Sequence, residues 1–176
     1  KIEPNTTYHD KEWGIPQHSD KKLFEFLILE GAQAGLSWST ILNRRDGYRL
    51  AFSNFDAVKV SKYTPNHVKK LIQNKAIIRN KLKINSAINN ARQFIKIQKE
   101  FGSFDEYLWG FVNHKPIKNK FKKYSDLPSY TTISKKLSQD LKKRGFNFVG
   151  PTICYALMQA VGMVNDHTVD CFKFLK

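Results

Sequence analysis

The sequence has 176 residues, of which 41% are hydrophobic and 13% aromatic, enough for a buried core and too many for a disordered chain. Thirty Lys and Arg against fifteen Asp and Glu give a formal net charge of +15, which fits a polyanionic partner and equally a merely soluble basic protein. The aromatic residues distributed through this basic chain favour a nucleic acid as the partner. Two cysteines, Cys154 and Cys171, exclude a disulfide framework and indicate a reducing compartment. No apolar run reaches the roughly 18 residues of a membrane helix. We therefore expect one cytoplasmic domain over residues 1–176, with no membrane partner.

Hydrophobic residues recur at intervals of three and four along most of the sequence, and strict two-residue alternation is almost absent. This pattern predicts an all-α fold. In chain order, the first three expected helices are capped by Ser19 with Asp20, by Ser37, and by Thr64 before Pro65. The fourth has the hydrophobic stripe Ile84, Ala87, Ile88, Ala91, Phe94 and Ile95, and the fifth begins at the capping box of Ser103 and Glu106. The sixth has the stripe Ile133, Leu137 and Leu141, and the last begins at Pro151. The charged segment 115–123 (KPIKNKFKK) is expected to be a solvent-exposed loop.

Two glycines, Gly145 and Gly150, lie five residues apart between the last two expected helices. They allow a tight turn whose backbone amides approach a ligand, and the helix that follows favours an anion at its N-terminal end. Lys142, Lys143 and Arg144 add positive charge at the same place. These features are typical of a helix–hairpin–helix motif, here about residues 132–162, which holds a DNA phosphate without reading sequence. An ordinary helix connection with a glycine C-cap is the alternative.

Glu30 ends an apolar run and is followed by small residues. It lies seven residues after Leu23 and three after Leu27, on the buried side of the expected helix. A carboxylate is costly there unless it is paired, so Glu30 is either a structural anchor or a ligand contact. An extrahelical base needs aromatic faces and a hydrogen-bond acceptor, which Tyr8, Trp38 and Glu30 would supply.

His167 and Cys171 are four residues apart, so both would lie on one face of a helix, and both side chains are good zinc ligands. Taken alone, the spacing favours two unrelated side chains over a metal site. Cys154 lies inside an apolar run and is expected in the core.

Five stretches of the sequence resemble 3-methyladenine DNA glycosylase I, a family of the helix–hairpin–helix glycosylase superfamily. Their order and spacing match from about Tyr8 to Cys171, nearly the whole chain. The stretches are YHDKEWG from Tyr8, LEGAQAGLSW from Leu29, FVNH from Phe111, KKRGFNFVG from Lys142 and NDH from Asn165.

The resemblance implies two helical lobes around a base-binding cleft, and it assigns roles to residues at matching positions. Glu30, the candidate catalytic residue, would contact the amino edge of the adenine, while Tyr8, Trp38 and Trp13 would stack on the base or line its pocket. Where the family often has a further pocket tyrosine, this sequence has Asn5, so one wall of the pocket is expected to differ. The residues implied to contact DNA are Gly35 and Leu36, at the gap left by the flipped nucleotide, and Lys143, Arg144, Gly145, Phe146, Phe148 and Gly150.

The implied reaction is hydrolysis of the N-glycosidic bond of 3-methyladenine in alkylated double-stranded DNA, by a monomer that flips the base and releases it free. Residues 145–162 contain no lysine to form a Schiff base, so the enzyme is expected to be monofunctional, without strand cleavage. Asp166 is interpreted as structural. Two alternatives stay open: a module that binds DNA or RNA through the hairpin without chemistry, and a glycosylase with a changed substrate.

The resemblance also implies a structural zinc ion that joins the two ends of the chain. His9, His167 and Cys171 occupy three of the ligand positions, and the fourth ligand is expected to be a cysteine before Lys1.

Overall fold

The computed structural model describes residues 3–174, and this part of the chain is built almost wholly from helices. The helices are α1 (Asn5–Lys11), α2 (Asp20–Gln33), α3 (Trp38–Leu42), α4 (Arg45–Ala51), η1 (Ser53–Phe55), α5 (Ala57–Ser61), α6 (Pro65–Leu71), α7 (Lys81–Phe101), α8 (Phe104–Gly110), η2 (Tyr124–Asp126), α9 (Thr132–Lys143) and α10 (Pro151–Ala160). The strands β1 (Ile117–Lys118) and β2 (Val164–Asn165) pair in parallel. The all-α prediction is confirmed.

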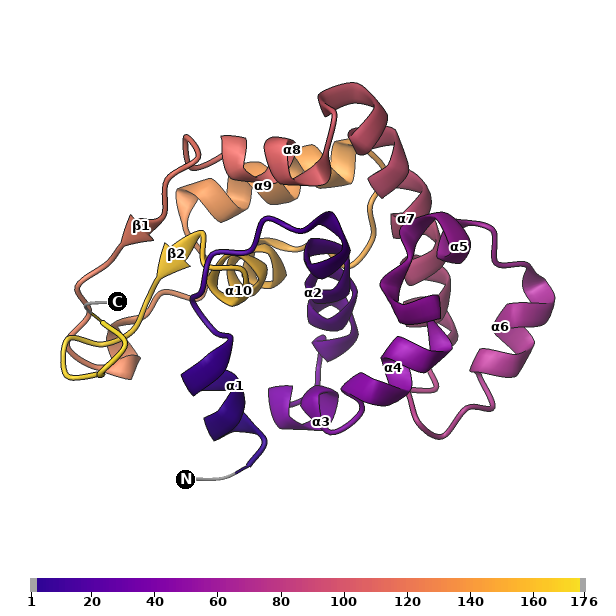
Figure 1. Ribbon diagram of the computed structural model, residues 1–176, viewed down its shortest axis with the longest axis horizontal. Helices are drawn as coiled ribbons and strands as arrows, with labels where there is room; N and C mark the ends of the chain where they lie inside the picture. The colour runs from indigo at the N-terminus through magenta and orange to yellow at the C-terminus, as the bar shows by residue number, and fades with distance from the viewer. Residues whose placement is uncertain (1–2, 175–176) are drawn as a thin grey trace.

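Helix α2 lies at the centre of the molecule (Figure 1). Ten consecutive residues of this helix, from Leu23 to Ala32, are buried, because α3, α7, α8 and α10 pack around it. A helix that is apolar on all sides can be stable only where it is surrounded in this way. Its position brings Glu30 into the interior of the protein.

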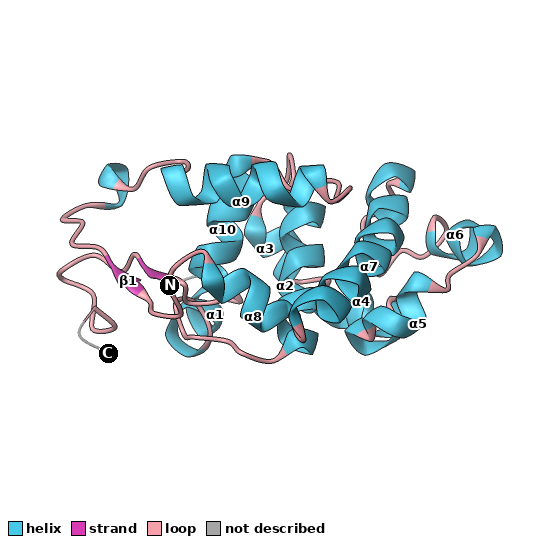
Figure 2. Cartoon of the chain, turned by 90° about the horizontal axis from the view of Figure 1, so that it is seen from above, coloured by secondary structure: helices cyan, strands magenta, loops and turns pink. Residues whose placement is uncertain are grey.

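The other elements gather on two sides of α2. Figure 1 shows α4 to α7 on one side, with α1, α10 and the strand pair on the other and α8 and α9 along the top. Figure 2 shows α9 above α10. The buried side chains of both sides join in one hydrophobic cluster. None of the described helices is long and apolar enough to cross a membrane.

The helix ends predicted from the sequence are largely confirmed. Ser37 and Ser103 each accept a hydrogen bond from the backbone N–H three residues later. The stripe predicted from Ile84 to Ile95 belongs to α7, and Gly145 follows α9 with a positive φ of 88°. The side chain of Glu106 contacts His114 instead of completing a capping box.

Ser19 was expected to cap α2, and this expectation is wrong because its side chain forms no capping hydrogen bond. Its neighbour Asp20 instead forms hydrogen bonds with residues of α7 and α8. The two carboxylate oxygens of Asp20 accept hydrogen bonds from the backbone N–H groups of Phe104 and Asp105, 2.9 and 2.8 Å away, and from the side-chain amide of Gln98. The first residue of α2 therefore holds the first turn of α8.

Replacing Asp20 by alanine should lower the free energy of unfolding by about 2–3 kcal/mol, because the first-turn N–H groups of α8 lose a charged acceptor. The matched control is Asp46→Ala, whose side chain is 90% exposed and which should cost less than about 1 kcal/mol. Urea unfolding measures both. Equal stability of the two variants would contradict the anchoring role of Asp20.

Candidate functional site

A cavity of about 830 Å³ opens between the N-terminal helices and the C-terminal part of the chain. Its lining comes from α1, α2 and α3 on one side, and from α10, residues 166–171 and the loop 122–129 on the other. Protein sites for small ligands commonly have volumes of about 300–1,000 Å³. The cleft predicted between two lobes therefore exists, although helices α4 to α8 contribute no lining residue in the described structure.

Glu30 lines this cavity from the last turns of α2. Its side chain is 4% exposed, and within residues 3–174 it has no hydrogen bond or ion pair. Burial raises the pKa of Glu30 to about 8, because the surroundings disfavour a charge. Of the two interpretations of Glu30, the structural anchor is excluded by the lack of a partner.

Tyr8 and Trp38 form an aromatic wall beside Glu30. Their rings are 5.3 Å apart between centroids and inclined by 54°. The Tyr8 hydroxyl and the Trp38 ring N–H are buried without a hydrogen-bond partner, although both residues line the cavity. Buried polar atoms in proteins usually have a hydrogen-bond partner, so these two groups are available to bind a ligand in the cavity. Burial also raises the pKa of Tyr8, which keeps its hydroxyl protonated.

Trp13 and Asn5 occupy different places with respect to the cavity. Trp13 lines it, as predicted, and its ring meets the His167 ring edge to face at 4.6 Å. Asn5 is exposed at the start of α1 and lies outside the lining. The Asn5 side chain therefore contributes nothing to the pocket wall, and the expected difference from the family at this position stays a prediction.

The turn between α2 and α3 presents Gly35 and Leu36 at the surface, outside the cavity lining. Gly35 has a φ of 76°, which L side chains rarely adopt, and Leu36 is 39% exposed. The ammonium of Lys83 fixes this turn by donating to the backbone oxygens of Ala32 and Ala34, 2.8 and 2.6 Å away. An apolar side chain is thus held at a defined position beside the cavity.

The segment between α9 and α10, which was predicted to form the hairpin, is a short connection with a defined backbone. Phe148 has a φ of 54°, and its side chain packs over Gly31, next to Glu30 in α2. Phe146 is buried, and the backbone N–H of Asn147 donates to Asn90 in α7. The hairpin is therefore fixed to both α2 and α7. Lys143, Gly145 and Gly150 are at least partly exposed.

Arg144 was predicted to contact DNA, and the structure gives it another environment. Its guanidinium donates to Asp140 at 2.6 Å and to both carboxylate oxygens of Glu100 at 2.7 and 3.1 Å. It also lies over the rings of Phe101 and Tyr107. Its charge is neutralised within the molecule, which leaves no free cation at this position of the hairpin.

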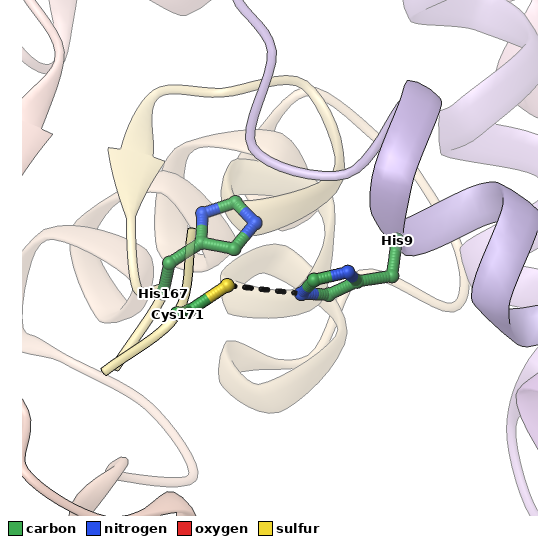
Figure 3. A group of neighbouring side chains, drawn as sticks. All are labelled: His9, His167 and Cys171. Atoms are coloured by element: carbon green, nitrogen blue, oxygen red, sulfur yellow. Dashed lines mark hydrogen bonds between the residues drawn. The ribbon is translucent and has the colours of Figure 1, made fainter. Parts of the chain in front are cut away.

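His9, His167 and Cys171 meet beside the cavity (Figure 3). One ligand atom of each lies within 4.8 Å of the others, and the Cys171 sulfur is 3.6 Å from Nε2 of His9. The expected cysteine before Lys1 lies outside the described residues. Cys154 is buried in the core, as predicted.

The two histidines are oriented as metal ligands usually are. Nδ1 of His9 contacts a carboxylate oxygen of Asp10, and Nδ1 of His167 contacts the amide oxygen of Asn165, both at 2.8 Å. Such contacts fix the ring and leave Nε2 for a metal. Nε2 of His167 is buried without a partner. Burial lowers the pKa of His167 to about 4, so the imidazole is neutral, as metal binding requires. The three side chains fit a zinc ion.

Asp166 is buried at the edge of the cavity and already accepts three hydrogen bonds. Its donors are the hydroxyl of Tyr155 and the side-chain amides of Gln159 and Asn119, at 2.5, 2.8 and 2.7 Å. This environment supports the structural interpretation of Asp166. Gln33, Tyr155 and Gln159 also line the cavity, and sequence reasoning missed them. The spacing of Gln33 three residues after Glu30 was the available sign.

The unpaired carboxylate of Glu30 should make the protein less stable as it ionises. Its pKa is about 8 in the folded state and near 4.5 in the unfolded state, so stability is complete below pH 4.5 and falls as the pH rises to 8. The loss at pH 7 is about 3 kcal/mol. Glu30→Gln should therefore unfold at higher urea concentration than the wild type at pH 7.5, with the gain vanishing near pH 4.5. A difference that is independent of pH would contradict the assignment.

Known proteins resemble this chain over nearly its whole length. The model of the methyladenine glycosylase family matches residues 2–174. DNA-3-methyladenine glycosylase 1 of Escherichia coli strain K12 is 49% identical over 164 residues, 93% of this chain and 88% of that protein. A crystal structure of 3-methyladenine DNA glycosylase I has 43% identity and a TM-score of 0.95, covering 98% of this chain and 96% of that one. The Staphylococcus aureus 3-methyladenine DNA glycosylase I, solved to explain 3-methyladenine recognition, has 36% identity and a TM-score of 0.95, covering 97% and 91% of the two chains. The chain belongs to the methyladenine glycosylase family.

Proposed function

We propose that this protein is a base-excision repair glycosylase that hydrolyses the N-glycosidic bond of 3-methyladenine in alkylated DNA and releases the free base. The observation that carries the proposal is the unpartnered, buried carboxylate of Glu30 in an aromatic-walled cavity of about 830 Å³. Relatives that cover most of the chain are named for this activity, and one solved relative binds 3-methyladenine.

The pocket can distinguish the damaged base by its charge. Methylation at N3 gives the adenine in DNA a positive charge, and the rings of Tyr8 and Trp38 present electron-rich faces to a cation. The Glu30 side chain is mostly protonated at pH 7 in the empty pocket, since its pKa is about 8. A cationic base in contact lowers that pKa, so that the ionised carboxylate both accepts from the amino group and balances the charge. Neutral adenine provides no such compensation.

The reaction itself requires little from the protein. The bond from C1′ of the sugar to the base breaks, its electron pair leaves with the base and neutralises it, and a water oxygen bonds to C1′ and loses a proton. Because the methylated base is already a cation, it needs no protonation to leave. Asp166 is saturated with hydrogen bonds, and residues 145–162 contain no lysine for a Schiff base, in accord with simple hydrolysis.

We also propose that the substrate is double-stranded DNA, held by a monomer in the cytoplasm. The exposed Leu36 would fill the gap left by the flipped nucleotide. The backbone of the hairpin at Gly145 and Gly150 would bind a phosphate, with Lys143 adding charge. The charge of +15 agrees with this partner.

A structural zinc ion would complete the junction between the two ends of the chain. His9, His167 and Cys171 would hold it, and its role would be to join α1 to the C-terminal segment. This junction borders the cavity, because Trp13 packs against the ring of His167. The metal would therefore support the pocket wall without taking part in hydrolysis.

A DNA-binding module without chemistry is the competing function. Phosphate binding by the hairpin does not require an unpaired buried carboxylate, whose ionisation destabilises the fold. The cavity residues therefore favour the enzyme, and the alternative predicts DNA binding without base release.

Glu30→Gln should release 3-methyladenine from alkylated DNA roughly 10–100-fold more slowly than the wild type, because an interaction with a charged group is worth about 1.5–3 kcal/mol. The control is Glu106→Gln, an exposed side chain on α8. The measurement is chromatography of released bases, with strand cleavage assayed before alkali. Wild-type rates in Glu30→Gln would refute the role of Glu30, and no release by the wild type would leave only the binding module.

Purified protein should contain about one zinc ion per chain, and Cys171→Ala should lose it. Cys154→Ala is the control, since this buried thiol is not among the candidate ligands and its loss should leave the metal content unchanged. Elemental analysis gives the stoichiometry, and thermal unfolding should show destabilisation of Cys171→Ala. Wild-type protein without bound metal would overturn the zinc proposal.

A further inference from the structure

The loop 115–123 places a row of free positive charges beside the cavity. It has five lysines in nine residues and no acidic residue, and all five lysines are exposed. None of their ammonium groups forms an ion pair with any residue between 3 and 174. Sequence analysis predicted only a solvated loop here, and the function proposed above does not use it.

Hydrogen bonds fix the backbone of this loop to the C-terminal part of the chain. Strand β1 pairs with β2, and the backbone N–H of Asn119 donates to Asn165 at 3.1 Å. The Asn119 side chain donates to Asp166, and the backbone oxygen of Phe121 accepts from Val169 at 3.0 Å. The loop is therefore a fixed support for its lysines.

The side chains alternate along this extended segment. Ile117, Asn119 and Phe121 are partly buried, whereas Lys118, Lys120 and Lys122 are exposed. Successive side chains of an extended chain point to opposite faces, so Lys118 and Lys120 share the outer face, and Lys122 follows them where the backbone bends. Alternate residues are about 6.6 Å apart, similar to the distance between successive phosphates along one nucleic-acid strand.

The lysine row leads directly to the mouth of the pocket. Lys122, Lys123 and Tyr124 belong to the lining of the cavity that contains Glu30, and the Tyr124 side chain is 84% exposed there. A nucleotide whose base occupies the cavity must keep its own strand at this mouth, because the base remains attached to its sugar. The phosphates next to the flipped nucleotide therefore lie within reach of this loop.

We infer that Lys118, Lys120 and Lys122 form a second phosphate-binding surface, which holds the strand that carries the flipped nucleotide. The inference rests on the proposed function. The loop would supply positive charge that the hairpin does not supply at Arg144, whose guanidinium is paired with Glu100 and Asp140.

The test removes three charges and measures how DNA binding depends on salt. Each phosphate neutralised contributes about −0.9 to the slope of log K against log salt concentration. The triple variant Lys118→Gln, Lys120→Gln, Lys122→Gln should therefore reduce the slope for a duplex with an abasic-site analogue by about 2.7. The matched control is Lys69→Gln, Lys70→Gln, Lys75→Gln, exposed lysines on α6 and the turn after it, on the far side of α2 (Figure 1).

The outcomes separate this inference from the proposed function. A reduced slope in the loop variant alone supports the surface, whereas a slope equal to that of the wild type or the control overturns it. Binding of free 3-methyladenine, followed by tryptophan fluorescence, should be unchanged in the double variant Lys118→Gln, Lys120→Gln, whose side chains lie outside the cavity lining. If the wild type releases base from alkylated DNA while the slopes are equal, the surface is wrong and the function stands. If the wild type releases no base, the function fails whatever the slopes show.

Discussion

The burial of an unpaired carboxylate is the constraint on which the rest of the structure depends. Glu30 has no partner among the described residues, so keeping it inside costs stability whenever it ionises. The rest of α2 offsets this cost, since the helix is buried from Leu23 to Ala32 by the helices that pack around it. The pocket therefore depends on a strongly packed helix whose last turns open to a cavity. A buried carboxylate without a partner in the described structure, as at Glu30, can pair with a positively charged ligand that enters the cavity.

The two ends of the chain complete the pocket, and they are far apart in the sequence. Tyr8 comes from α1, whereas Tyr155 comes from α10 and His167 from the segment after β2, and all three line one cavity. Short helix α1 has few apolar residues of its own to hold it against the fold. The approach of His9 to Cys171 gives this wall a fixed position, because it joins α1 to the C-terminal segment. Recognition of the base thus relies on a contact across nearly the whole chain length.

The sequence predicted the parts of this protein that follow from local periodicity. The buried face of α2, and therefore the position of Glu30, could be derived from spacing, as could α7 and the hairpin with Gly145. Helices α1, α4 and α5 were not predicted. They are as short as α3, α6 and α8, whose caps were recognised, but α1 and α4 begin without a side-chain capping hydrogen bond. Helices of this length owe their form to packing. The cavity walls near Tyr8 were assigned by resemblance and not by pattern. Arg144 shows why the remainder could not be derived: its partner Glu100 is 44 residues away, and no local pattern reveals that pairing.

Affinity for DNA and recognition of damage are separated in this structure. The exposed lysines of the loop 115–123 and of the hairpin meet water, so their attraction to phosphates is screened by salt and independent of sequence. Glu30 lies in an apolar interior, where the interaction with a cation is screened much less. In the proposed function, the surface charges would hold DNA of any sequence at the mouth of the cavity, whereas only a cationic base would gain from entering it. Selectivity for alkylated adenine then requires no reading of the DNA sequence. Methylation gives the damaged base a positive charge, and this charge is the partner that the buried Glu30 carboxylate does not have within residues 3–174.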